Sequence, residues 1–120
     1  MEPKASHGKR ILLVEDEFSV RDTLRQLLRH DDHTVVEANN GAEALILFAQ
    51  HKFDLVVTDF VMPFVDGAEL AARIKHRMPN QPILMITGHD VRPSRLNSVN
   101  GVLRKPFDLG ELRFALTRVL

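Results

Sequence analysis

Three carboxylates, one hydroxyl and one ammonium group stand directly after short hydrophobic runs of this sequence. Clustered carboxylates repel one another, and they therefore favour a hard cation with oxygen ligands, most simply Mg²⁺. A carboxylate beside such a cation can attack phosphorus and become an acyl phosphate. A hydroxyl and an ammonium group can then neutralise the phosphoryl oxygens, so the pattern indicates phosphoryl chemistry. The residues concerned are Glu15, Asp16, Asp59, Thr87 and Lys105.

Short apolar runs alternate with amphipathic stretches, and this alternation predicts the elements that position the polar groups. Continuous apolar runs are typical of strands buried on both faces, and apolar residues three or four positions apart are typical of helices. The alternation predicts a parallel sheet with helices on both sides, whose strands present their carboxyl ends along one ligand-binding edge. We expect strands over residues 11–14, 34–36, 55–57, 83–86 and 102–103.

The segments between these strands predict four helices and one irregular connection. Asp66-Gly67 is expected to form the turn that opens the third helix, with Gly67 free to take a positive φ. The segment of residues 88–100 is short and contains Pro93, so we expect a single turn or a loop there. The residues expected to face the sheet are Val20, Leu24, Leu27, Leu28, Ala42, Leu45, Phe48, Ala49, Leu70, Ala71, Ile74, Met78, Leu109, Leu112, Leu116 and Leu120.

Composition restricts the classes of function. The 120 residues suffice for one domain, and 16 basic side chains balance 16 acidic ones, so nothing electrostatic indicates a nucleic acid or an anionic membrane as partner. Because there is no cysteine, disulfides, thiol catalysis and cysteine-based zinc sites are excluded. No apolar run is long enough to span a bilayer, and a cytoplasmic location is expected. Residues 1–9 are polar and are expected to form a flexible tail.

Five motifs carry a resemblance to a known family. They are residues 11–17 (ILLVEDE), 54–63 (DLVVTDFVMP), 66–67 (DG), 85–88 (MITG) and 105–107 (KPF). From Arg10 to Leu120 the chain resembles the receiver domain of two-component response regulators. The resemblance implies a flavodoxin-like, doubly wound α/β fold with a five-stranded parallel sheet. The strand order 2-1-3-4-5 is borrowed from a chemotaxis regulator of this family.

The resemblance also implies roles for individual residues. Asp59 would accept a phosphoryl group from a histidine kinase or a histidine phosphotransfer protein, with Mg²⁺ or Mn²⁺ as cofactor, and would thereby switch protein–protein interactions in a phosphorelay. The chain would catalyse only its own phosphorylation and dephosphorylation and would not be an enzyme in the ordinary sense. The other implied roles are metal binding by Glu15, Asp16, Asp59 and the backbone carbonyl of Val61, the switch hydroxyl of Thr87, phosphate pairing by Lys105, and a cis bond before Pro106.

Three departures from the family pattern stand out. The position three residues before Lys105 is usually aromatic and couples phosphorylation to the output face, but here it is Val102. Residues 88–100 replace a full fourth helix on the usual dimerisation surface, so the oligomeric state stays open. Val61 and His89 occupy two variable positions that tune dephosphorylation in relatives, and an apolar Val61 cannot position an attacking water molecule.

Several functions remain as alternatives. A pseudo-receiver, which would act as an interaction module without phosphorylation, is favoured by Val102 and the altered fourth helix. A phosphatase with an aspartyl nucleophile would need a second acid at the position of Val61, and a flavin-binding module would need a phosphate loop rich in Ser and Thr after the first strand. No Walker A loop is present. The chain is either a single-domain regulator or a fragment of a longer protein.

Overall fold

The computed structural model describes residues 8–120, and within this range it contains one five-stranded parallel sheet. The strand order is β2-β1-β3-β4-β5, which confirms the predicted doubly wound α/β fold. Of the expected tail, residues 1–7 lie outside the described residues. No helix in the described range is long and apolar enough to cross a membrane. The strands are β1 (Arg10–Val14), β2 (Thr34–Ala38), β3 (Leu55–Asp59), β4 (Ile83–Thr87) and β5 (Gly101–Arg104).

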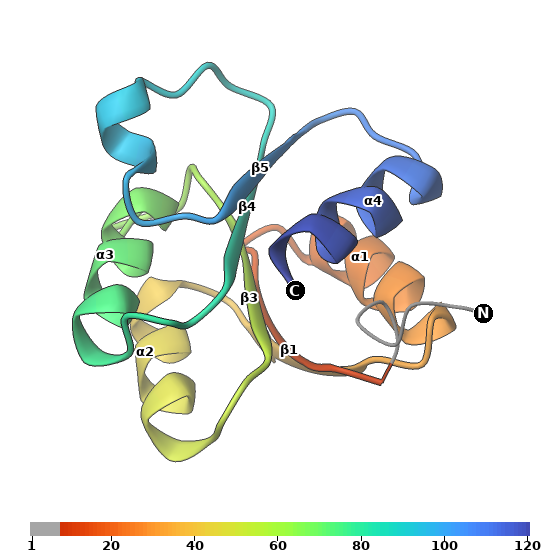
Figure 1. Cartoon of the computed structure of the whole chain (residues 1–120), viewed down its shortest axis with the longest axis horizontal. Helices are drawn as coiled ribbons and strands as arrows, with labels where there is room; N and C mark the ends of the chain where they lie inside the picture. The colour runs from red at the N-terminus through yellow and green to blue at the C-terminus, as the bar shows by residue number, and fades with distance from the viewer. Residues whose placement is uncertain (1–7) are drawn as a thin grey trace.

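Helices cover both faces of this sheet, as Figure 1 shows with α2 and α3 on one side and α1 and α4 on the other. Two separate hydrophobic clusters fill the layers, one beneath α2 and α3 and the other beneath α1 and α4. The alternating residues of β1 divide between them, with Leu12 in one cluster and Leu13 in the other. The helices are α1 (Phe18–His30), α2 (Gly41–Gln50), α3 (Gly67–Arg77) and α4 (Leu109–Val119).

Register places the carboxyl ends of the central strands side by side. Val14 of β1 pairs with Thr58 of β3, and Asp59 pairs with Ile86 of β4. Residues 11–14 of β1 and 83–87 of β4 are entirely buried, so their apolar side chains fix both strands between the helix layers. Every residue that directly follows one of these strands is therefore held near the same edge of the sheet.

Polar caps define where three helices begin. The side chain of Asn40 accepts a hydrogen bond from the backbone N–H of Glu43 at the start of α2. Asp66 caps α3 through the N–H of Glu69, and Asp108 caps α4 in a reciprocal capping box with Glu111. These caps satisfy backbone donors that would otherwise lack partners, and they fix the entry of each helix close to the strand that precedes it.

The predicted inward faces are partly wrong. Ala42 and Ala49 are exposed, and α2 instead buries Gly41, Ala44 and Phe48. The helix is apolar around most of its circumference, so spacing alone did not identify its buried face. Met78 was also expected to face the sheet, but it is 49% exposed because it lies at the C-cap of α3, beyond the last helical turn.

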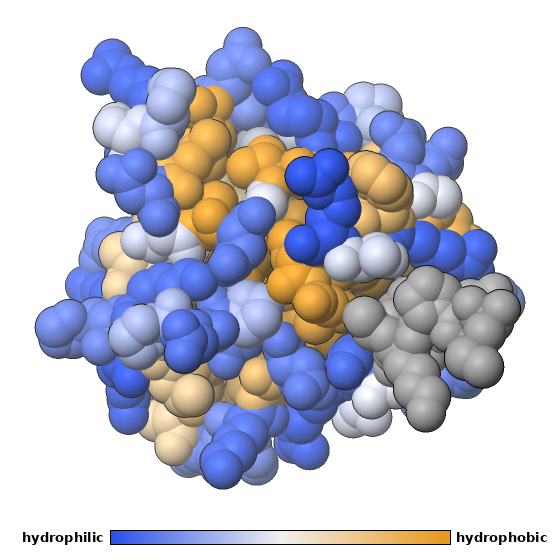
Figure 2. All heavy atoms as spheres, viewed as in Figure 1, coloured by the Kyte–Doolittle hydropathy of each residue, from blue (hydrophilic) through white to orange (hydrophobic). Residues whose placement is uncertain are grey.

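The expected irregular connection at residues 88–100 is confirmed. Between β4 and β5 the chain forms only a short 3-10 turn, η2 (Pro93–Leu96), which has no buried residue. A groove of about 670 Å³ lies between β5 and α4, lined by Val102 and Phe114 among others. In Figure 2, apolar side chains gather on this face between the η2 turn and α4. Val102 and Phe114 are 39% and 65% exposed.

Gly67 is required for a different reason from the one expected. Its φ is not positive; a Cβ atom at this position would instead lie 2.2 Å from the backbone oxygen of Asp59. The N–H of Gly67 also donates to the carbonyl of Phe60 over 2.8 Å. The start of α3 therefore packs directly on the backbone that carries Asp59, and only a residue without a side chain fits.

We predict that Gly67→Ala lowers the free energy of unfolding by about 3 kcal/mol, because the added methyl group must displace backbone atoms. Urea denaturation followed by circular dichroism measures the change. The matched control is Gly110→Ala, whose Cβ would lie 3.4 Å from the nearest atom. This control should be neutral or stabilising by up to about 1 kcal/mol. Equal stability of Gly67→Ala and the wild type would refute the packing argument.

Candidate functional site

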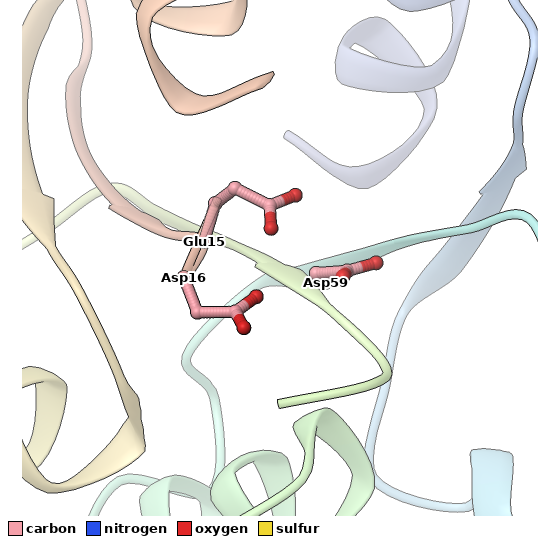
Figure 3. Close-up of side chains that lie close together, drawn as sticks. All are labelled: Glu15, Asp16 and Asp59. Atoms are coloured by element: carbon pink, nitrogen blue, oxygen red, sulfur yellow. The ribbon is translucent and has the colours of Figure 1, made fainter. Parts of the chain in front are cut away.

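Three carboxylates converge at the edge of the sheet where β1 and β3 end. Glu15, Asp16 and Asp59 each offer an oxygen atom, and these atoms lie within 4.8 Å of one another. Figure 3 shows Glu15 and Asp16 following one strand and Asp59 at the end of its neighbour, with their carboxylates around a common space. A set of carboxylate oxygens at this spacing suits a hard divalent cation such as Mg²⁺.

The backbone after β1 is held from two sides. The N–H of Glu15 donates to the carbonyl of Ala38, which extends the pairing of β1 with β2. The buried side chain of Arg21 donates through Nη1 to the carbonyl of Glu15 over 2.8 Å. These contacts fix the turn that presents the carboxylates of Glu15 and Asp16. Sequence reasoning missed Arg21, although its spacing of three and seven residues from Leu24 and Leu28 places it on the buried face of α1.

Glu15 is buried in an unfavourable electrostatic environment. Its side chain is 3% exposed, and its carboxylate accepts from the N–H of Glu17 and lies 3.4 Å from Nζ of Lys105. Burial, together with the nearby charge of Asp59, raises the pKa of Glu15 to about 7. The carboxylate therefore takes up a proton near neutral pH unless additional positive charge is supplied.

Asp59 is partly buried and has two stabilising neighbours. Nζ of Lys105 lies 3.5 Å from Oδ1 of Asp59, and the nearby backbone N–H of Phe60 also favours the charged carboxylate. Burial nevertheless raises the pKa of Asp59 above its ordinary value, with Lys105 and the Phe60 N–H acting in the opposite direction. One ammonium group thus bridges Glu15 and Asp59 without compensating all three acids.

Thr87 ends β4 in the same region and is fully buried. Its hydroxyl oxygen accepts from the backbone N–H of His89 over 3.0 Å, and the hydroxyl can donate to the His89 carbonyl at 3.4 Å. His89 itself is exposed. The hydroxyl is therefore engaged with the start of the β4–β5 connection (residues 88–100). Within the described residues, this hydroxyl forms no hydrogen bond with a carboxylate of the cluster.

The remaining predicted site residues lie around this edge. Val61, two residues after Asp59, is 50% exposed and offers only an apolar side chain. The Lys105–Pro106 peptide bond is cis. Val102 lies on β5 opposite Met85, where its exposed side chain lines the groove described above and not the acidic cluster.

This fold and this arrangement of acids, hydroxyl and lysine define a receiver domain. The family model of the response regulator receiver domain matches residues 11–117, and the chain therefore belongs to that family. Comparison with curated proteins gives the same class. Response regulator MprA of Mycobacterium sp. (strain KMS) is 37% identical over 107 residues, covering 86% of this chain and 46% of the relative.

A second curated relative is the transcriptional regulatory protein TcrA of Mycobacterium tuberculosis, 36% identical over 117 residues, which cover 94% of this chain and 46% of the relative. The chain thus spans about half the length of the curated relatives it matches. The shared half is the receiver domain, so the activities of the complete relatives are not carried over.

Solved structures agree with the fold. Response regulator TrrA of Thermotoga maritima, in complex with Mg²⁺ and BeF, has a TM-score of 0.88 and 31% identity, covering 93% of this chain and 99% of that one. Chemotaxis protein CheY4 of Vibrio cholerae has a TM-score of 0.86 and 29% identity, covering 94% and 99%. Both cover nearly the whole chain, so the departures between β4 and β5 lie within a conserved overall architecture.

We predict that Mg²⁺ affinity increases about tenfold between pH 6 and pH 8, because a carboxyl with a pKa near 7 must lose its proton to bind metal. Without metal, the free energy of unfolding changes with pH in the opposite direction. A raised carboxyl pKa favours the folded state most at low pH, and this contribution is lost as pH rises through 7. Isothermal titration calorimetry measures the affinity. Glu15→Gln should bind Mg²⁺ more weakly and with nearly the same affinity at every pH. A wild-type affinity that is equal at pH 6 and pH 8 would contradict the raised pKa of Glu15.

Proposed function

We propose that this receiver domain is a phosphorylation-controlled signalling module whose phosphoacceptor is Asp59. The observation that carries the proposal is the meeting of three carboxylates within 4.8 Å beside the ammonium group of Lys105. Such a site gains stability from added positive charge, and it places one nucleophilic oxygen where a phosphoryl group could be neutralised. The phosphoryl donor would be a histidine kinase or a histidine phosphotransfer protein.

The transfer itself makes modest chemical demands on the protein. An oxygen of Asp59 forms a bond to phosphorus while the N–P bond of a phosphohistidine breaks, and the leaving imidazole takes up a proton. Catalysis consists mainly of alignment and charge neutralisation of the equatorial oxygens. Lys105 would pair with one phosphoryl oxygen. The Thr87 hydroxyl would break its hydrogen bonds with the His89 backbone and donate to another phosphoryl oxygen. No free substrate is turned over, so the chain would not be an enzyme in the ordinary sense.

The cofactor proposed is Mg²⁺, with Mn²⁺ as a substitute. Glu15, Asp16, Asp59 and the backbone carbonyl of Val61 would hold it, and when bound it offsets the negative charge of the incoming phosphoryl group. The raised pKa values of Glu15 and Asp59 support this ligand set, because burial makes their charged forms costly and a bound cation would offset that cost. The complex of TrrA with Mg²⁺ and BeF is consistent with it.

A pseudo-receiver that never carries phosphate is the alternative. It is favoured by Val102 and by the short η2 turn, since both remove parts of the family's usual output mechanism. The acidic cluster and its lysine argue for the first proposal, because a module without metal or phosphate would gain nothing from this unfavourable burial of acids. The two functions differ in one measurable property, the formation of an acyl phosphate.

We predict that acetyl phosphate with Mg²⁺ adds one phosphoryl group to the protein, detected by intact mass, and that Asp59→Asn abolishes the adduct. The control is Asp90→Asn, because Asp90 is 95% exposed and pairs only with Arg104 in the described region. This control should be modified like the wild type. Failure of the wild type to form any adduct, with Mg²⁺ binding intact, would favour the pseudo-receiver.

We further predict that the acyl phosphate decays roughly tenfold faster in Val61→Glu or Val61→Asn than in the wild type. A polar side chain at this exposed position can orient an attacking water molecule, although less effectively than a fully positioned proton-transfer group. Loss of the adduct after removal of acetyl phosphate gives the rate. Val61→Leu is the apolar control and should decay at the wild-type rate. Equal decay rates in all four proteins would refute a role of the side chain at position 61 in dephosphorylation.

A further inference from the structure

The middle of the β4–β5 connection is held by few apolar contacts, although Val99 near its end is partly buried against the hydrophobic cluster beneath α2 and α3. None of its residues is fully buried, and the η2 turn is closed mainly by the N–H of Arg95 donating to the carbonyl of Arg92. Segments with few buried apolar contacts have low local stability, so a small number of polar contacts determines their position. The connection also begins directly after Thr87, whose hydroxyl is engaged with His89.

One residue of this connection reaches the loop that follows the proposed phosphoacceptor. Nη2 of Arg95 lies 2.6 Å from Oδ2 of Asp66, and its guanidinium lies 5.7 Å from the centre of the Phe60 ring. Phe60 and Asp66 are the two ends of the β3–α3 loop (residues 60–66). Arg95 therefore contacts both ends of this loop from a segment 29 residues away in sequence.

These contacts lead to Asp59 in one step. Phe60 directly follows Asp59 in the chain, and its carbonyl accepts from the backbone N–H of Gly67. Asp66 uses its second oxygen to cap α3, whose first residue packs on the Asp59 backbone. Arg95, Asp66 and Phe60 thus form one path of contacts between the β4–β5 connection and the backbone at Asp59.

We propose that Arg95 is a positioning residue that couples the β4–β5 connection to the state of Asp59, an inference that rests on the proposed phosphorylation. The connection is attached to the site at two points, through Thr87 at its start and through Arg95 in its middle. A phosphoryl group that recruits the Thr87 hydroxyl changes the first attachment, and the second transmits the change between the connection and the β3–α3 loop. The coupling is reciprocal, since each site biases the other.

Matched variants separate this role from ordinary structural support. Arg95→Gln removes the ion pair, and Asp66→Asn removes the same ion pair while an Asn side chain still caps α3. Arg95→Lys keeps the charge and should restore part of the effect. Arg104→Gln is the control, because Arg104 pairs with Asp90 of the same connection and, among the described residues, forms no ion pair with the β3–α3 loop.

The experiment measures amide hydrogen exchange of residues 88–100 with Mg²⁺, before and after addition of beryllofluoride as a phosphoryl analogue. The wild type and Arg104→Gln should show a change of about threefold or more. Arg95→Gln and Asp66→Asn should lose most of this response, and their combination should add little. By reciprocity, Arg95→Gln should also change the affinity for beryllofluoride about threefold, the size expected of one exposed ion pair with a ring contact.

The outcomes distinguish the two proposals. A wild type that is not modified at Asp59 by acetyl phosphate overturns the proposed function. A wild type that is modified, but whose residues 88–100 exchange equally with and without beryllofluoride, overturns only the coupling. The coupling also fails if Arg95→Gln responds like the wild type, or if Arg104→Gln loses the response to the same extent.

Discussion

Like-charge crowding of three carboxylates at adjacent strand ends is the constraint that the rest of this structure has to support. Glu15, Asp16 and Asp59 lie within 4.8 Å of one another, and one ammonium group, that of Lys105, stands between two of them. Burial, and after it the charge of Asp59, raise the pKa of Glu15 to about 7, so the ammonium group of Lys105 does not fully offset them. Isolated buried charge is expensive, so such a cluster persists only where the surrounding fold holds it in place.

The surrounding fold provides that rigidity from two apolar layers. Strands β1 and β3 are buried on both faces, and their register brings Val14 opposite Thr58, immediately before the acids begin. Neither strand can slip without moving side chains from one packed layer to the other. The close approach of Gly67 to the carbonyl of Asp59 fixes the third side of the site. The acids are therefore forced together by packing that does not involve them.

The sequence predicted the strands, their order with the help of the family, and the polar residues at their ends, because apolar runs and strand-end positions are local signals. It predicted the buried face of α2 only in part: Phe48 and Leu45 do face the core, but Ala42 was expected there in place of Ala44, because spacing does not separate them in an almost wholly apolar helix. It did not predict the Arg95–Asp66 ion pair or the role of Arg21, because such contacts depend on where the η2 turn and α1 lie in space. The sequence identified Gly67 as a special position but for the wrong reason. A side chain is excluded there by the nearby backbone of Asp59 and not by a positive φ.

The same repulsion supplies what a switch requires energetically. A ligand shifts a conformational equilibrium only by the difference in its affinity for the two states. Under the proposed function, a cation and a phosphoryl group would relieve the crowding of negative charge around Glu15 and recruit the hydroxyl of Thr87, which is engaged with His89 in the present state. Val102 provides no ring that could carry this change to the groove beside α4. Under the same proposal the change would pass through the β4–β5 connection, whose η2 turn buries no residue and can therefore rearrange without breaking core packing.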